Sequence, residues 1–162
     1  LEGTFLPLPE LDPGLALSGN VAYVDAIYTD FENGSGFRED TGLYAENLRY
    51  TGNRIVRTPK WSGGVGVVQT IDAARGAYEI GIDSYFNSGF YYDANNTVEE
   101  DAYSIWNARL GYLHDPWKLR VTVFGKNLLD KRYHVQQFQT DFGVTKTLAA
   151  PRQYGVRVGW EF

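Results

Sequence analysis

The chain closes on the stretch Pro151-Arg152-Gln153-Tyr154-Gly155-Val156-Arg157-Val158-Gly159-Trp160-Glu161-Phe162. From Tyr154 onward every even position is apolar, and every odd position is a glycine or a charged residue. A period of two predicts a β-strand with one apolar and one polar side. This strand therefore separates two surroundings that differ sharply in polarity.

The same alternation recurs upstream and predicts seven strands in all. In the segment 117–126, for example, Val121 and Val123 lie opposite Arg120 and Thr122, and Trp117 begins the apolar side. We find no amphipathic helix of useful length. The other expected strands are a partial one at 1–6 and full ones at 15–23, 61–71, 78–87, 103–112 and 151–162.

The connections between these strands alternate in length. Tight turns with Pro or Gly are expected near 10–14, 72–76 and 113–117, whereas long polar links lie near 32–59, 92–101 and 134–150. Short turns at one end and long loops at the other indicate an all-β, antiparallel, up-and-down meander. Transmembrane β-barrels of the outer membrane are built in this way.

Aromatic residues make up 15% of the chain, and they gather near the predicted strand ends. Trp and Tyr collect at membrane interfaces because each has an apolar ring and a polar tip. The sequence thus predicts two aromatic rows. Those at the tight-turn end are Tyr78, Tyr112, Trp117, Trp160 and Phe162, and those at the long-loop end are Trp61, Phe90, Tyr91, Tyr92, Tyr103 and Tyr154.

Periodicity alone does not say which side of the sheet faces inward. A soluble barrel or sandwich alternates too, with its apolar side inside. The polar sides here are rich in glycine, such as Gly64, Gly66 and Gly155, and this favours a transmembrane barrel with a polar interior. Two alternatives stay open: a self-contained small outer-membrane barrel that acts as an adhesin or anchor, and a soluble lipocalin-like ligand-binding barrel. The strand count and the pairing of the first and last strands distinguish the self-contained small barrel from a portion of a larger barrel.

Composition excludes several classes of function. The 162 residues hold no Cys, only two His, and 15 Lys and Arg against 20 Asp and Glu. We therefore expect no nucleic-acid partner, no nucleophilic enzyme, no cofactor and no metal site. The oxygen-rich segment 93–101 could bind calcium, but a solvated outer loop is the commoner explanation.

The chain has no Met, and seven is an odd number of strands, whereas bacterial single-chain barrels have an even number. A strand edge left unpaired in lipid would cost several kcal/mol for each orphan backbone group. We therefore expect residues 1–162 to be a portion of a larger barrel.

Two motifs resemble segments near the end of TonB-dependent outer-membrane receptors. The stretch Val123-Phe124-Gly125-Lys126-Asn127-Leu128-Leu129-Asp130-Lys131-Arg132-Tyr133 is similar to their "fgxNLxDkxY" signature, and Ala150-Pro151-Arg152-Gln153-Tyr154-Gly155-Val156 resembles their ending. Segments 20–26 and 58–62 resemble upstream parts of the same barrels. The motif positions are Asn127, Leu128, Asp130, Tyr133, Pro151 and Arg152.

The resemblance implies a 22-stranded barrel in the outer membrane of a Gram-negative bacterium. This chain would be the C-terminal portion of that barrel, with the N-terminal plug domain absent from it. Such receptors import scarce ligands, such as siderophore-iron, cobalamin or saccharides, with energy from the TonB complex. The implied partners are membrane lipid and lipopolysaccharide, the remaining strands and plug, TonB through the missing N-terminal part, and the barrel-assembly machinery. The small-molecule ligand itself stays unidentified.

The resemblance also suggests a C-terminal assembly signal, formed by Tyr154, Val156, Val158, Trp160 and Phe162. The residues themselves favour a structural role for Asn127 and Asp130, whose side chains end a strand by bonding the local backbone.

Ligand contacts are expected in two regions. Exposed loop aromatics are one region, with Phe37, Tyr44, Tyr50, Phe138 and Phe142 as candidates. The polar wall is the other, with Asn107, Arg109, Arg120, Lys126 and Arg157 as candidates. The wall cations could attract an anionic ligand, but pairing with the plug or with Glu79, Asp83 and Glu161 is the favoured interpretation.

Overall fold

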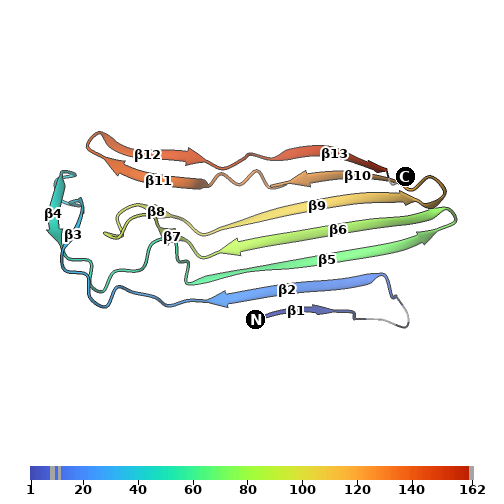
Figure 1. The fold of residues 1–162 in the computed structure, drawn as a ribbon, viewed down its shortest axis with the longest axis horizontal. Helices are drawn as coiled ribbons and strands as arrows, with labels where there is room; N and C mark the ends of the chain where they lie inside the picture. The colour runs from blue at the N-terminus through green and yellow to red at the C-terminus, as the bar shows by residue number, and fades with distance from the viewer. Residues whose placement is uncertain (8–9, 11, 161–162) are drawn as a thin grey trace.

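Seven strands, six long ones and the short first strand, form one antiparallel sheet in the computed structural model, which describes residues 1–7, 10 and 12–160. Each strand pairs with the next long strand along the chain, so the sheet is an up-and-down meander (Figure 1). This confirms the all-β, antiparallel, seven-stranded prediction. In sheet order the strands are β1 (Glu2–Phe5), β2 (Leu15–Tyr23), β5 (Trp61–Ala73), β6 (Gly76–Asn87), β9 (Tyr103–His114), β10 (Leu119–Lys126) and β13 (Gln153–Trp160).

The strand register places apolar residues on one side of the sheet, and polar residues and glycines on the other. Val121 of β10 lies opposite Tyr112 of β9 and Val158 of β13, whereas the next residue, Thr122, lies opposite Gly111 and Arg157. A slip of one residue would exchange the two faces, so the alternation in the sequence fixes the register. The sheet thus has one apolar face and one polar face.

The apolar face is not covered by any other part of the described chain. Val158 keeps 65% of its surface exposed, and Ile82, Val67 and Leu110 are also exposed. The buried apolar side chains among the described residues are only Tyr50 and Val98, and both lie outside the long strands. The dry centre that a soluble barrel or sandwich needs is therefore absent from the described residues.

The sheet is open at both sides, because β1 begins the strand order and β13 ends it. The closed wall of a self-contained small barrel, and the enclosed apolar pocket of a lipocalin-like barrel, are both absent from the described chain. No helix in the described residues has the length and apolar character needed to cross a bilayer.

Four predicted strand boundaries near the tight turns were wrong. The segment 115–117 is a short 3-10 helix, η1 (Asp115–Trp117), so β10 begins at Leu119 and Trp117 belongs to the turn. Pro116 restricts its own φ and removes a backbone donor, which favours a turn over a ladder. The neighbouring β5, β6 and β9 each extend two residues further toward the turns than predicted. Phe162 and Glu161 lie outside the described residues.

The three long links carry short ladders that the sequence analysis treated as plain loops. They are the hairpins β3 (Gly34–Phe37) with β4 (Tyr44–Leu48), β7 (Phe90–Tyr91) with β8 (Glu99–Glu100), and β11 (His134–Thr140) with β12 (Gly143–Leu148). Figure 1 shows all three at the end of the sheet opposite the tight turns. The long-loop end is therefore a structured layer.

Glycines on the polar face let large side chains lie flat against the sheet. The Arg109 guanidinium lies over Gly81, and the Phe124 ring lies over Gly155, so a Cβ at either glycine would overlap its neighbour. These four residues share one row across β6, β9, β10 and β13. The glycines thus let these bulky side chains lie close to the sheet, so that they project little from the polar face.

Candidate functional site: the polar face and the long loops

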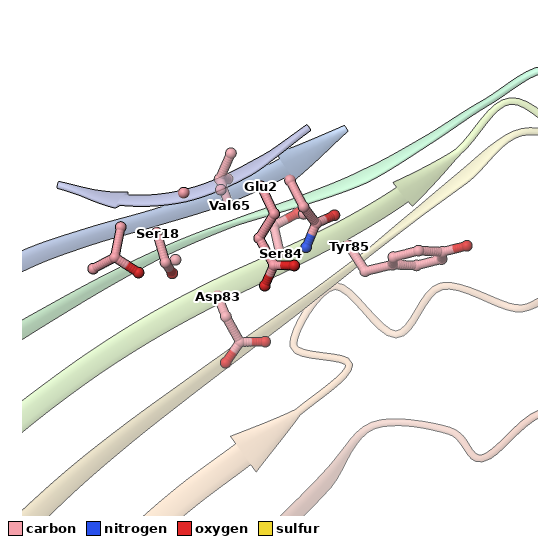
Figure 2. A pocket seen from close by; sticks show the side chains of 12 residues that line it. Glu2, Ser18, Val65, Asp83, Ser84 and Tyr85 are labelled. Atoms are coloured by element: carbon pink, nitrogen blue, oxygen red, sulfur yellow. The ribbon is translucent and has the colours of Figure 1, made fainter. Parts of the chain in front are cut away.

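The polar face differs in charge between its two halves. Over β1, β2, β5 and β6 it holds a groove of about 310 Å³, lined by Glu2, Asp83, hydroxyl residues and glycines. Figure 2 shows Glu2, Ser18 and Asp83 on the polar side of these strands, with the Tyr85 ring extending from the same region. The half formed by β9, β10 and β13 carries cations instead.

Two of the four predicted wall cations pair with one carboxylate. Arg109 Nε donates to Glu79 Oε1 at 2.9 Å, and the Arg120 guanidinium lies 3.8 Å from Glu79 Oε2. All three side chains are partly exposed, so the pairs contribute roughly 0–1 kcal/mol each. For Arg109 and Arg120 the favoured interpretation, pairing with Glu79, matches the observed contacts.

The other two wall cations lie around an aromatic ring. Lys126 Nζ is 5.8 Å from the centre of the Phe124 ring, and Arg157 Cζ is 6.0 Å from it. Both cations are exposed, and within the described residues neither has an ion pair at 4.0 Å or less. Within the described residues, the polar wall thus holds two cations that share one carboxylate and two cations that have no ion pair.

Asn127 forms the corner where β10 ends. It adopts a left-handed φ of 49°, and its side chain is buried. The Asn127 amide donates to the carbonyls of Lys131 and Ala150 and accepts from the Lys131 N–H at 2.9 Å. Asp130, at φ 50°, accepts from the Arg152 N–H at 2.9 Å. Both side chains therefore terminate the ladder through local backbone bonds, in agreement with the structural role favoured from the sequence.

The other motif positions pack around this corner. Leu128 N donates to Trp106 O at 2.8 Å, and the Tyr133 ring stacks on Tyr103 with centroids 4.4 Å apart. The described contacts of these residues are with the protein's own chain, so they support the return of the polypeptide into β13.

Tyr50 was predicted as an exposed loop aromatic, and this prediction was wrong. Only 2% of its surface is exposed, because its ring lies over Gly34 and Gly36 of β3 and packs edge-on against Phe31, with centroids 5.1 Å apart. Of the other loop candidates, Tyr44, Phe138 and Phe142 are exposed, and Phe37 is half-buried. Phe142 lies in the turn between β11 and β12.

Asparagine side chains join the first long link to the second. Asn96 Oδ1 accepts from the Arg54 N–H at 2.7 Å, and Asn96 Nδ2 donates to Arg54 O at 3.0 Å. Asn53 donates to Ala94 O, and Asn95 donates to Phe37 O. These bonds replace water at four backbone groups, so the two links form one layer.

The oxygen-rich segment 93–101 is half-buried over 93–97 and folded onto its own backbone there, whereas Glu99 and Asp101 are exposed. The Asp93 carboxylate accepts from Thr97 Oγ1 at 2.7 Å and from the Val98 N–H at 2.8 Å. No group of three or more potential metal-ligating side chains occurs within the described part of the chain.

Glu100 joins the second long link to the third. Its carboxylate is nearly fully buried and accepts from the His134 N–H at 3.1 Å, from His134 Nδ1 at 3.0 Å and from Gln137 Nε2 at 2.9 Å. The contact between the Glu100 carboxylate and His134 Nδ1 is a hydrogen bond in the tautomer that carries a proton on Nδ1. We call Glu100, His134, Gln137 and Tyr92 the Glu100 junction.

Tyr92 completes the Glu100 junction. Its hydroxyl donates to His134 O at 2.6 Å, and its ring lies 5.4 Å from Arg57 Cζ. Burial, followed by the nearby negative charge of Glu100, raises the pKa of Tyr92 to about 12. The sequence analysis did not find this junction, because its members come from segments more than thirty residues apart.

The chain is similar in sequence to a family of known proteins. The family model described as "TonB dependent receptor-like, beta-barrel" matches residues 2–128. The pesticin receptors of Yersinia pestis and Yersinia enterocolitica are each 23% identical over 128 residues, which cover 79% of this chain and 18% of theirs. The chain thus spans about a fifth of the length of these relatives.

Solved structures share the fold. The ferric yersiniabactin uptake receptor FyuA from Yersinia pestis superimposes with a TM-score of 0.76 at 19% identity, covering 97% of this chain and 22% of that one. The siderophore receptor PiuA from Acinetobacter baumannii gives 0.71 at 21% identity, covering 92% and 20%. The ferric citrate transporter FecA gives 0.69 at 20% identity, covering 98% and 23%.

Replacing Glu100 with Ala is expected to loosen the junction, because three donors on His134 and Gln137 lose their acceptor. The opening free energy of segments 90–100 and 134–140 should fall by about 1–3 kcal/mol. Hydrogen exchange of these segments measures the change. The matched control is Glu99→Ala, since Glu99 is exposed and adjacent; equal exchange in both variants would contradict the role of the buried carboxylate.

The Tyr92 hydroxyl makes the junction sensitive to alkaline pH. Its folded-state pKa of about 12 lies above the ordinary value of 10.0, so its contribution is complete below about pH 10 and is lost as the pH rises through about 12. The wild type should therefore be more stable than Tyr92→Phe at pH 9, and the difference should shrink by pH 11.5. Denaturant titrations at both pH values measure this, and a difference that grows with pH would contradict it.

Proposed function

Because the chain belongs to the TonB-dependent receptor β-barrel family, we propose that it is the C-terminal portion of a receptor that imports a scarce ligand across the outer membrane of a Gram-negative bacterium by TonB-coupled transport. The matched proteins are named as receptors and transporters. The proposed role is accordingly transport, not enzymatic catalysis.

The observation that carries this proposal is the two-faced sheet. Aliphatic side chains such as Val158, Val123 and Ile80 project from one face, and no other part of the described chain covers them. The opposite face carries glycines, carboxylates and cations. A wall with hydrocarbon on one side and water on the other accounts for both faces, because the backbone groups between neighbouring strands pair with each other and not with either surrounding.

Further strands and a plug domain complete the proposed receptor. The family's 22-stranded barrel would supply partners for the outer edges of β1 and β13, and the plug would lie against the polar face. In this arrangement membrane lipid and lipopolysaccharide contact the apolar face, and TonB is engaged through parts outside this chain. The tight turns then face the periplasm, and the long-loop layer faces the exterior.

An iron chelate is the proposed type of ligand. FyuA is titled a ferric yersiniabactin uptake receptor, PiuA a siderophore receptor and FecA a ferric citrate transporter. The exposed loop aromatics Tyr44, Phe138 and Phe142, together with the polar wall, are the proposed contact regions. Uptake of radioactive iron from a panel of chelates, by a receptor-deletion strain with and without the full-length gene, tests this. Equal uptake in both strains for every chelate would refute it.

We also propose that the C-terminal segment carries the assembly signal, formed by the exposed apolar residues Tyr154, Val156, Val158 and Trp160 of β13 together with Phe162. Deletion of Phe162 is expected to lower the amount of heat-modifiable receptor in outer-membrane fractions, because the assembly machinery loses a recognition contact. Amounts of heat-modifiable receptor equal to those of the wild type would contradict a role of Phe162 in the assembly signal.

Arginine substitutions at two adjacent positions test the facing of the sheet. Val121→Arg places a charge on the apolar face and should lower the unfolding free energy of the full-length receptor in lipid by about 2–4 kcal/mol. Thr122→Arg, on the polar face, is the matched control and should have a mild effect. Denaturant titration in vesicles measures both, and equal losses would contradict the assigned facing.

A further inference from the structure

We propose that the turn between β9 and β10 binds the headgroup of a zwitterionic phospholipid, with the phosphate on Lys118 and the ammonium on Asp115. This inference rests on the proposed function, under which the tight turns face the periplasm and their edge meets the periplasmic leaflet. The turn consists of η1 (Asp115–Trp117) followed by Lys118, and Figure 1 shows it at the end of the sheet where β13 ends. The site thus lies far from the long-loop layer.

An open, mostly apolar hollow of about 550 Å³ lies beside this turn. Small-molecule sites occupy about 300–1,000 Å³, so the hollow has room for a headgroup and the first part of an acyl chain. Leu119 and Trp160 are opposite each other in register, two residues beyond the Val121–Val158 pair of the apolar face. The hollow therefore opens at the edge of the apolar face. It is lined by Pro116, Trp117, Lys118, Leu119 and Trp160.

Two exposed tryptophans flank the hollow. Trp117 keeps 68% of its surface exposed and Trp160 keeps 67%. The Trp117 ring lies 4.6 Å from the His114 ring, whose Nδ1 is buried without a hydrogen-bond partner among the described residues. The imidazole thus supports Trp117 through ring contact. An indole has an apolar ring and one N–H donor, which suits the boundary between hydrocarbon and headgroups.

Lys118 and Asp115 place opposite charges on one turn without an ion pair between them. Both side chains are exposed, and neither has an ion pair at 4.0 Å or less within the described part of the chain. The Lys118 N–H donates to Asp115 O at 3.2 Å, so the backbone keeps the two residues together. The neighbouring turn adds one charge of each sign, Asp72 and Arg75. A headgroup with one phosphate and one ammonium matches this balance, whereas Asp115 repels a headgroup of net negative charge.

The backbone of Lys118 does not by itself account for a lysine at this position. Lys118 ends η1 with a φ of 49°, in the left-handed region where glycine and asparagine are the usual residues. A glycine would therefore end this turn with less strain. What lysine adds is a side chain at the rim of the hollow, with a full positive charge and three N–H donors for phosphate oxygens.

These features assign each part of the lipid to a part of the site. The phosphate accepts from Lys118 Nζ and from the Trp117 indole N–H, and the ammonium donates to the Asp115 carboxylate. The glycerol and first methylenes lie over Leu119, between the two tryptophans. Free phosphate would gain the lysine contact but would leave the apolar hollow open to water, so it is the weaker ligand.

Native mass spectrometry of the purified full-length receptor in a neutral detergent tests the site. The probes are dioleoylphosphatidylethanolamine, which is zwitterionic, dioleoylphosphatidylglycerol, which is anionic, and inorganic phosphate. Lys118→Gln should weaken the tightest binding of phosphatidylethanolamine by about tenfold, the loss of one charge-assisted bond. The matched control is Lys146→Gln, which removes an exposed lysine of β12 at the opposite end and should change binding less than about twofold.

Two further variants give readouts that a merely structural role would not move. Asp115→Asn should lower the preference for phosphatidylethanolamine over phosphatidylglycerol by about tenfold, because the carboxylate that selects the ammonium is removed. Phosphatidylethanolamine brominated close to the glycerol should quench tryptophan fluorescence more in the wild type than in Trp117→Phe. All variants should stay heat-modifiable, which shows that the barrel is folded.

Three results would overturn the proposal: equal effects of Lys118→Gln and Lys146→Gln, a wild-type preference for phosphatidylglycerol, or binding of inorganic phosphate as tight as that of the phospholipid. The last result would assign the turn to a free anion. These lipid measurements do not depend on transport, so failure of every chelate uptake assay would instead refute the proposed function.

Discussion

The backbone hydrogen-bond ladder is the constraint on which the rest of this structure depends. Each long strand pairs with the next, from β1 to β13, so the sheet needs no second layer to satisfy its polar backbone. The side chains are then free to differ completely between the two faces. An isolated sheet of this kind in water would leave Val158, Ile82 and Leu110 about half exposed and would forgo about 1 kcal/mol or more of burial for each side chain. The ladder therefore makes the fold possible, and the hydrocarbon environment that we propose would make it stable.

On the polar face, glycines make room for the side chains of neighbouring strands, a role separate from that of glycine in tight turns. Gly81 and Gly155 lie in one row with Arg109 and Phe124, and each glycine is covered by the large side chain of its neighbour. Large residues thus lie along the wall instead of filling the space in front of it. This arrangement gives a shallow, charged surface suited to contact with a plug or a passing ligand.

The sequence predicted the strands well because alternation is a local property, whereas the contacts of the long loops are not local. The period around Val121 and Val158 predicted both the strands and the side chains that share one face of the sheet. By contrast, Glu100 meets His134 across 34 positions, and Asn95 reaches Phe37 across 58. Tyr50 was predicted to be exposed because it lies in a polar link. The sequence does not show that its ring packs over Gly34 and Gly36. Likewise, no local pattern distinguishes Arg120, which shares Glu79, from Arg157, which does not.

The facing of the last strand tests the central claim most directly. The 162 residues contain no cysteine, so single cysteines at positions 154–160 would be the sole spin-labelling sites in this portion of the receptor. In reconstituted vesicles, collision with oxygen, which concentrates in hydrocarbon, should be high at 154, 156, 158 and 160 and low at 155, 157 and 159. A water-soluble nickel chelate should give the opposite alternation. Equal accessibility to the nickel chelate at Val158 and Arg157 would contradict a wall that separates lipid from a polar channel.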